Sequence, residues 1–91
     1  MPGVRDHEGG RAVARVRMFA AAREAAGTGA DTVPGATVAE VLRAAEERYG
    51  PAFSAVLAAS RVWCNGEEVA PDHPVGDNDE VAVLPPVSGG A

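Results

Sequence analysis

The chain has 91 residues, a formal net charge of −5 and a sequence pI of about 4.8. This length suits one domain rather than two, and the core is modest because much of the 46% hydrophobic content is alanine. The eight basic residues are all arginines and form no basic stripe, which argues against a nucleic-acid partner.

The sequence also lacks features of secreted, membrane and metal-binding proteins. Its one cysteine, Cys64, excludes an internal disulfide framework and a cysteine-cluster metal site. No apolar run approaches the roughly 20 residues that a membrane span needs, and the chain does not open with a signal-peptide pattern. We therefore predict a soluble cytoplasmic protein with no metal site and no membrane partner.

The first third of the chain predicts two strands and a short helix. Residues 1–11 are polar and show no periodicity, so we expect a disordered leader. Apolar residues alternate with arginines in 12–19, which is typical of a strand with one wet face. Strong helix formers fill 20–26, and 31–35 is typical of a short strand closed by a Pro-Gly turn.

The clearest predicted element is a helix over residues 37–49. Thr37 suits the N-cap and Glu40 follows three residues later, as in a capping box. Apolar residues share one face at helical spacing: Val38, Val41, Leu42, Ala45 and Tyr49. Gly50-Pro51 ends this helix, and the following AFSAVLAAS allows a further short helical turn.

The last part of the chain predicts a hairpin and a final strand. Asn65-Gly66 is a preferred type I′ pair between the two arms of 61–69. Residues 75–79 are rich in turn formers. The final strand, 80–84, is almost entirely apolar, so we expect it to be central and buried on both faces.

This order of elements predicts an α+β fold with a mixed sheet and one main helix across one face. A β-grasp (ubiquitin-like) arrangement fits, with the first and last strands paired in parallel at the sheet's centre. The domain would then span 12–84, and 85–91 would leave the middle of the sheet as a flexible C-terminal tail.

The tail has the properties of a thread. Pro85-Pro86 stops the strand, because proline cannot donate to the ladder, and this stiff pair projects the last residues away from the domain. Val87 gives one apolar grip, and Ser88 is followed by two glycines that can enter a channel too narrow for any side chain. The alternative is an ordinary disordered end, in which glycine is common.

The chain resembles the MoaD/ThiS family of ubiquitin-like sulfur carriers, and within it the MoaD branch, the small subunit of molybdopterin synthase. The resemblance covers about residues 12–90. The matching segments are MFAAAREAAGT (18–28), TVAEVL (37–42), CNGEEV (64–69) and DNDEVAVLPPVSGG (77–90). The segment FAAAREAAGT favours the MoaD branch.

The resemblance implies how the tail works. An adenylating enzyme of the ubiquitin-activating type would use ATP to activate the Gly90 carboxylate, and sulfur would replace AMP to give a thiocarboxylate. Residues Pro86, Val87, Ser88 and Gly89 would thread into the partners, among them the large subunit of molybdopterin synthase. We therefore expect a carrier subunit that binds no cofactor, rather than an independent enzyme.

Ala91 departs from the family pattern, because it locks Gly90 in a peptide bond. A C-terminal peptidase that removes Ala91 is the first interpretation. Two alternatives stay open: activation tolerates the alanine, or the chain is a relative that carries no sulfur or has an artefactual end.

The candidate docking surface is the sheet face that carries Arg15, Arg17 and the odd-numbered side chains of the hairpin. On it Trp63 is either core or an exposed interface anchor. Asp79 and Glu80 are either partner contacts or turn-forming residues. Cys64 has no obvious histidine partner, so we expect a structural cysteine rather than a nucleophile.

Two other functions stay open on the sequence. The same chemistry could deliver sulfur to thiamine, cysteine or a secondary metabolite, because the partner selects the end use. The scaffold could also serve as a non-catalytic interaction module or a protein modifier, since one fold hosts several functions.

Overall fold

The structure, a computed structural model, describes residues 13–86. It contains five strands and three helices in the order β1 (Val13–Met18), α2 (Ala20–Ala26), β2 (Ala30–Pro34), α3 (Val38–Tyr49), α4 (Pro51–Ala58), β3 (Arg61–Cys64), β4 (Glu67–Glu68) and β5 (Glu80–Leu84). The predicted leader and most of the predicted tail lie outside these residues. Within them, no helix is long and apolar enough to cross a membrane.

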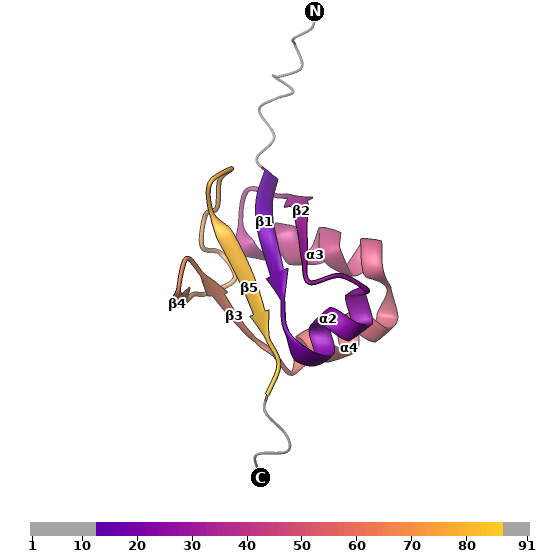
Figure 1. Ribbon diagram of the computed structural model, residues 1–91. Coiled ribbons are helices and arrows are strands. Elements are labelled where there is room, and N and C mark those ends of the chain that lie inside the picture. The colour runs from indigo at the N-terminus through magenta and orange to yellow at the C-terminus, as the bar shows by residue number, and fades with distance from the viewer. Residues whose placement is uncertain (1–12, 87–91) are drawn as a thin grey trace, which may run out of the picture.

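The five strands form one mixed sheet in the order β2-β1-β5-β3-β4 (Figure 1). The first and last strands pair in parallel at its centre, with Val16 opposite Val81, and the other neighbours are antiparallel. The predicted β-grasp fold is therefore confirmed, including the central place of the last strand.

All three helices lie against the same side of the sheet (Figure 1). β1 shows why: its even-numbered residues are buried and its odd-numbered residues are exposed. Phe53 and Met18 are the largest fully buried side chains, and valines of both layers fill most of the remaining core: Val16, Val33, Val38, Val41, Val81 and Val83.

The prediction that β5 is buried on both faces is wrong. Val81 and Val83 are fully buried under the helices, but Glu80, Ala82 and Leu84 on the other side are only half-buried. The reason is that no second layer of helices covers that side. The apolar character of Ala82 and Leu84 is therefore presented on a surface.

The predicted start of α3 is confirmed with one difference. The Glu40 N–H donates to Thr37 Oγ1 at 3.2 Å, which caps the helix. The Glu40 carboxylate accepts from the Ala36 N–H at 2.8 Å, one residue before the N-cap. At the other end Pro51 opens α4, so the predicted short turn is an eight-residue helix.

The predicted hairpin is also confirmed. Asn65 and Gly66 have φ values of 53° and 89°, as a type I′ turn requires. The Asn65 side chain ties the hairpin to β5, because its Oδ1 accepts from the Glu80 N–H at 2.9 Å. β3 is thereby held beside the central strand.

Candidate functional site

The carboxyl end of β5 is where the tail leaves the domain. β5 ends at Leu84, Pro85 is half-buried and Pro86 is exposed. The two prolines follow the end of β5, which lies between β1 and β3, so the tail starts from the middle of the sheet. The tail residues with predicted roles lie outside the described residues, and those roles stay predictions: Val87, Ser88, Gly89 and Gly90.

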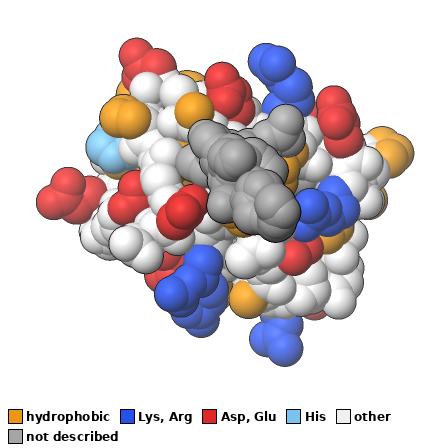
Figure 2. Space-filling view, turned by 90° about the horizontal axis from the view of Figure 1, so that it is seen from above, with side chains coloured by type: hydrophobic (Ala, Val, Ile, Leu, Met, Phe, Trp, Pro, Cys, Tyr) orange, Lys and Arg blue, Asp and Glu red, His pale blue; other side chains and the backbone are white. Residues whose placement is uncertain are grey.

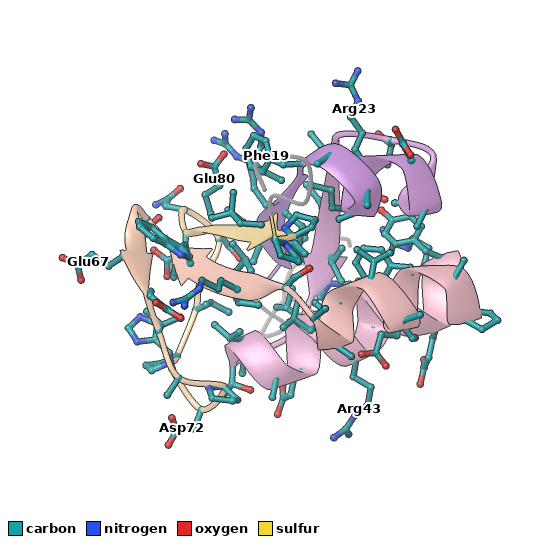
Figure 3. The ribbon with its side chains drawn as sticks, turned by 90° about the horizontal axis from the view of Figure 1, so that it is seen from below. Phe19, Arg23, Arg43, Glu67, Asp72 and Glu80 are labelled. Carbon is teal, nitrogen blue, oxygen red and sulfur yellow. The ribbon has the colours of Figure 1, made fainter. Side chains whose placement is uncertain are left out.

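The uncovered side of the sheet, which we call the open face, collects four of the five predicted docking residues. Arg15 and Arg17 come from β1, Trp63 from β3 and Glu80 from β5. The register places Arg15 opposite Glu80 and, across the sheet, Trp63 opposite Ala82. In Figure 3 Glu80 lies on the opposite side of the molecule from Arg43 of α3.

Three arginines surround a cavity of about 520 Å³ at the β1 side of the open face. Arg15, Arg17 and Arg23 line it together with Phe19 and Glu80. The Arg17 guanidinium lies 5.6 Å from the centre of the Phe19 ring, and its Nη1 is 3.3 Å from Glu80 Oε2. Within the described part of the chain Arg15 and Arg23 form no ion pair, so this cavity is positive although the chain is acidic.

Phe19 and Arg23 are surface residues that the sequence reasoning missed. Phe19 is 39% exposed, and Figure 3 shows it on the same side as Arg23 and Glu80. The next residue, Ala20, has a φ of 50°, which is unusual for a residue other than glycine and marks the turn that leads from β1 into α2. The alternation of β1 carried the signal, since Phe19 continues the exposed odd-numbered positions.

Trp63 lies at the other side of the tail root. It lines a cavity of about 340 Å³ with Ala59, Arg61, Leu84, Pro85 and Pro86. Its ring is half-buried, and its buried Nε1–H has no acceptor among the described residues. Trp63 is therefore neither a core residue nor freely exposed, and the structure joins it to the start of the tail.

The family follows from the whole domain. The model of the ThiS family matches residues 16–90. The chain belongs to the ThiS family of ubiquitin-like sulfur carriers. No curated protein matches it significantly.

Solved structures resemble this ThiS-family chain over nearly their full lengths. Small archaeal modifier protein 1 (SAMP1) from Methanosarcina acetivorans is 30% identical, with a TM-score of 0.79 over 87% of this chain and 97% of that one. SAMP1 from Haloferax volcanii is 32% identical, with a TM-score of 0.76 over 85% and 98%. A protein described as molybdopterin converting factor, subunit 1, from Pyrococcus furiosus is 26% identical, with a TM-score of 0.74 over 84% and 99%.

Asp79 lies apart from the tail of this ThiS-family chain. Its carboxylate accepts from the Gly76 N–H at 2.8 Å and from Asn65 Nδ2 at 2.9 Å, and these bonds hold its pKa below the usual range, with the bond from Asn65 contributing most. Asp79 precedes β5, so it belongs to the opposite end of the sheet. Figure 2 views that end and shows acidic and basic side chains interspersed around its rim. The turn-forming interpretation of Asp79 therefore has direct support, and its contact with a partner stays a prediction.

Cys64 is 4% exposed and belongs to the core. Burial, with a smaller effect of the Asp79 charge, raises the pKa of its thiol. A protonated, buried thiol is a poor nucleophile, which agrees with the predicted structural role. Among residues 13–86, no group of three or more His, Cys, Asp or Glu side chains is arranged to hold a metal ion.

Proposed function

We propose that this chain carries sulfur as a thiocarboxylate at Gly90 and donates it in molybdopterin synthesis, as the small subunit of a molybdopterin-synthase-type enzyme. The observation that carries the proposal is the tail root: the central strand of a sulfur-carrier fold ends at Leu84, and Pro85-Pro86 follow beside the Trp63 cavity, on the face that also carries Arg15 and Arg17. The molybdopterin assignment is supported by the likeness to molybdopterin converting factor, subunit 1.

The chemistry needs two steps at one carboxylate. In the first, a Gly90 carboxylate oxygen attacks the α-phosphorus of ATP, which forms the acyl adenylate and releases pyrophosphate. In the second, hydrosulfide or an equivalent sulfur donor attacks the acyl carbon, the C–O bond to AMP breaks, and the thiocarboxylate remains. The adenylate is needed because a free carboxylate is a poor electrophile and AMP is a good leaving group.

The domain would be recognised by the partner enzyme, and the partner would supply the catalytic groups. The arginine cavity offers Arg15 and Arg23 to acidic groups of a partner, and the Trp63 cavity offers an apolar contact. The Trp63 cavity includes Leu84, Pro85 and Pro86, where the tail starts, and the arginine cavity includes Phe19, whose N–H donates to the Val83 carbonyl near the end of β5. A partner that binds the open face would therefore receive Val87 to Gly90 in a defined direction.

Ala91 must be removed before Gly90 can react. Two forms of the protein test this requirement, one that ends at Gly90 and one that ends at Ala91. Each is incubated with a ubiquitin-activating-type enzyme, ATP and a sulfur donor, and its intact mass is measured. We expect a sulfur-for-oxygen mass increase in the Gly90 form alone, and the proposal fails if neither form gains sulfur.

A matched pair of tail variants tests the thread. Gly89→Ala adds one methyl group to the thread, whereas Ser88→Ala changes the neighbouring residue without widening the glycine pair. We expect Gly89→Ala to slow adenylation strongly and Ser88→Ala to leave it nearly unchanged. Equal rates for the two variants would show that the channel does not select for glycine.

The end use of the sulfur is tested with the acceptor enzymes. The thiocarboxylate form is mixed with a molybdopterin synthase large subunit and its precursor, and in parallel with the sulfur-accepting enzymes of thiamine and cysteine synthesis. Sulfur transfer only in the first mixture supports the molybdopterin assignment. Transfer only in one of the others keeps the carrier function and replaces its pathway.

A second candidate function is covalent protein modification. The SAMP1 proteins, which are named as modifiers, are 30% and 32% identical to this chain, against 26% for the molybdopterin converting factor subunit. The same acyl adenylate would then react with an amine of a target protein. Proteins of the native cell in which a lysine is joined by an isopeptide bond to the Gly90 carboxyl would favour this function over sulfur donation.

A further inference from the structure

The outer edge of the sheet at β2 exposes the backbone of alternate residues. The Met18 N–H of β1 donates to the Gly29 carbonyl at 2.9 Å, and Val16 lies opposite Asp31. Odd-numbered residues at this edge therefore direct their backbone groups at β1. The even-numbered ones direct theirs outward, where an edge strand can accept another chain: Ala30, Thr32 and Pro34.

Side chains already occupy these outward groups. The Thr28 hydroxyl donates to the Ala30 carbonyl at 3.0 Å and accepts from the Ala30 N–H at 3.4 Å. At Thr32 the N–H donates to Asp31 Oδ1 and the carbonyl accepts from Arg48 Nη1, both at 2.8 Å. Pro34 has no N–H. All three outward donor positions are thus closed, and so are the carbonyls of Ala30 and Thr32.

Asp31 and Arg48, which bond to the outward backbone groups of Thr32, are themselves held in place by each other and by Tyr49. Asp31 Oδ2 accepts from Arg48 Nη1 at 2.9 Å and from the Tyr49 hydroxyl. The Tyr49 ring packs edge to face on the fully buried Phe53, with ring centres 5.2 Å apart. Asp31 and Arg48 therefore need little further ordering to stay on the backbone of β2.

The opposite edge of the sheet is protected in another way. β4 has only two residues, Glu67 and Glu68, and both are exposed and acidic. Two residues offer few ladder bonds, and their charges repel a second copy of the same strand. Strand addition is thus opposed at both edges, by occupied backbone groups at β2 and by length and charge at β4.

We propose that Thr28, Asp31 and Arg48 form an edge cap that keeps β2 from pairing with a further strand, above all with β2 of a second copy of this chain. The cap leaves the open face as the part of the sheet that partners can use. A carrier that passes between an activating enzyme and an acceptor needs that face free and its own sheet unpaired. The proposal does not depend on the sulfur chemistry.

The test compares an opened edge with a matched control. The opened variant carries Thr28→Val, Asp31→Ala and Arg48→Met. The control carries Thr32→Val, Asp72→Ala and Arg43→Met, the same three types of change, with the same net charge, at side chains that close no backbone group of β2. Both are studied in the full chain by sedimentation velocity from about 10 µM to about 1 mM, because association follows mass action.

We expect the opened variant to approach the mass of a dimer at the highest concentration while the control stays monomeric like the wild type. The amide signals of Ala30 and Thr32 should shift with this association, and the Trp63 indole signal should not. A folded opened variant that stays monomeric overturns the proposal. So does an association that shifts Trp63 instead of β2.

Amide exchange in the wild type gives a second measurement, which holds even if the opened variant does not fold. The cap predicts that the Thr32 amide, although it points outward, exchanges at least about tenfold more slowly than the same amide in the single variant Asp31→Ala. The Ala30 amide should respond in the same way to Thr28→Val. Equal exchange rates with and without the capping side chain overturn the proposal.

Discussion

Trp63 of β3 and Pro86, the first exposed residue of the tail, line the same cavity. They do so because β3 runs antiparallel beside β5, with Trp63 opposite Ala82 and Arg61 opposite Leu84. A partner that takes the tail must therefore come close to Trp63.

The place of Trp63 beside the tail root predicts different effects for two of its substitutions. Trp63→Ala should weaken the affinity for the activating enzyme by about tenfold or more, since buried tryptophans dominate many interfaces. Trp63→Phe should keep most of the affinity and should not lower the free energy of unfolding by more than about 1 kcal/mol, because the lost Nε1–H has no acceptor among the described residues.

Calorimetric titration with the activating enzyme measures these affinities. Glu67→Ala is the control, because Glu67 is exposed on β4 and points away from the domain (Figure 3). If Trp63→Ala binds as tightly as Glu67→Ala, Trp63 is not an interface anchor.

We expect substitution of Gly35 to cause a large loss of stability. A Cβ at this position would lie 2.6 Å from the Val41 backbone nitrogen and 2.8 Å from Val41 Cγ2, where α3 crosses the end of β2. Gly35→Ala should therefore lower the free energy of unfolding by about 2 kcal/mol or more, because neither backbone can move away cheaply.

Gly27→Ala is the matched control for Gly35. Gly27 also has a positive φ, 80°, but a Cβ there would meet nothing within 4 Å. Its substitution should lower the free energy of unfolding by only about 1 kcal/mol, the cost of the left-handed backbone. Urea denaturation measures both values, and equal losses would mean that the approach of Gly35 to α3 is unimportant.

Cys64 should be dispensable for sulfur loading. Its thiol is buried and its pKa is raised, so the thiolate that could attack a persulfide or an adenylate is scarce. Cys64→Ala should leave the sulfur-for-oxygen mass increase at Gly90 intact, and iodoacetamide should label the wild-type thiol slowly until urea is added. A variant that folds but no longer loads sulfur would give Cys64 a chemical role.

The raised pKa of Tyr49 predicts a loss of stability at high pH. Burial, together with the hydrogen bond to Asp31, raises the pKa of Tyr49 from 10.0 to about 12. A group whose pKa is raised on folding stabilises the protein fully below its unfolded pKa, and this contribution is lost as the pH rises through the folded value. The free energy of unfolding should therefore fall between pH 10 and about 12, and Tyr49→Phe should flatten this fall.

The lowered pKa of Asp31 predicts a loss of stability at low pH. The hydrogen bond from Tyr49, followed by those from Arg48 and the Thr32 N–H, lowers the pKa of Asp31 below its ordinary value of 3.8. Its contribution to stability is present above pH 3.8 and is lost as the pH falls through the lower folded value. Acid unfolding of Asp31→Asn should show a weaker dependence on pH in that range. An unchanged dependence would mean that the pKa of Asp31 is the same in the folded and unfolded states.

Most local elements were predictable from the sequence because their signals are local. Alternation specified β1, the Thr37 cap and the apolar spacing specified α3, and Asn65-Gly66 specified the hairpin. The order of these elements then indicated a β-grasp arrangement, in which β1 and β5 pair in parallel at the centre of the sheet. The tail was recognised from Pro85-Pro86 and the glycines, although its last five residues lie outside the described part.

The site was predictable only in part, because its members come from distant parts of the chain. Arg15, Arg17 and Trp63 were placed on one face by alternation, but the cavity that joins Arg15 to Arg23 needs the turn at Ala20. The prediction for β5 failed for a related reason. The apolar sequence of a strand does not determine whether one or both of its faces will be covered. Here all three helices pack on one side of the sheet.

The order of residues alone established the strands, the main helix and the glycine thread, because backbone preference and side-chain periodicity act over a few neighbouring residues. Packing established the rest: which side of β5 stays open, why Phe19 is exposed beside three arginines, and how Asp31 and Arg48 close the edge of β2. These features join groups far apart in sequence, so they exist only once burial of one shared core has brought the layers together.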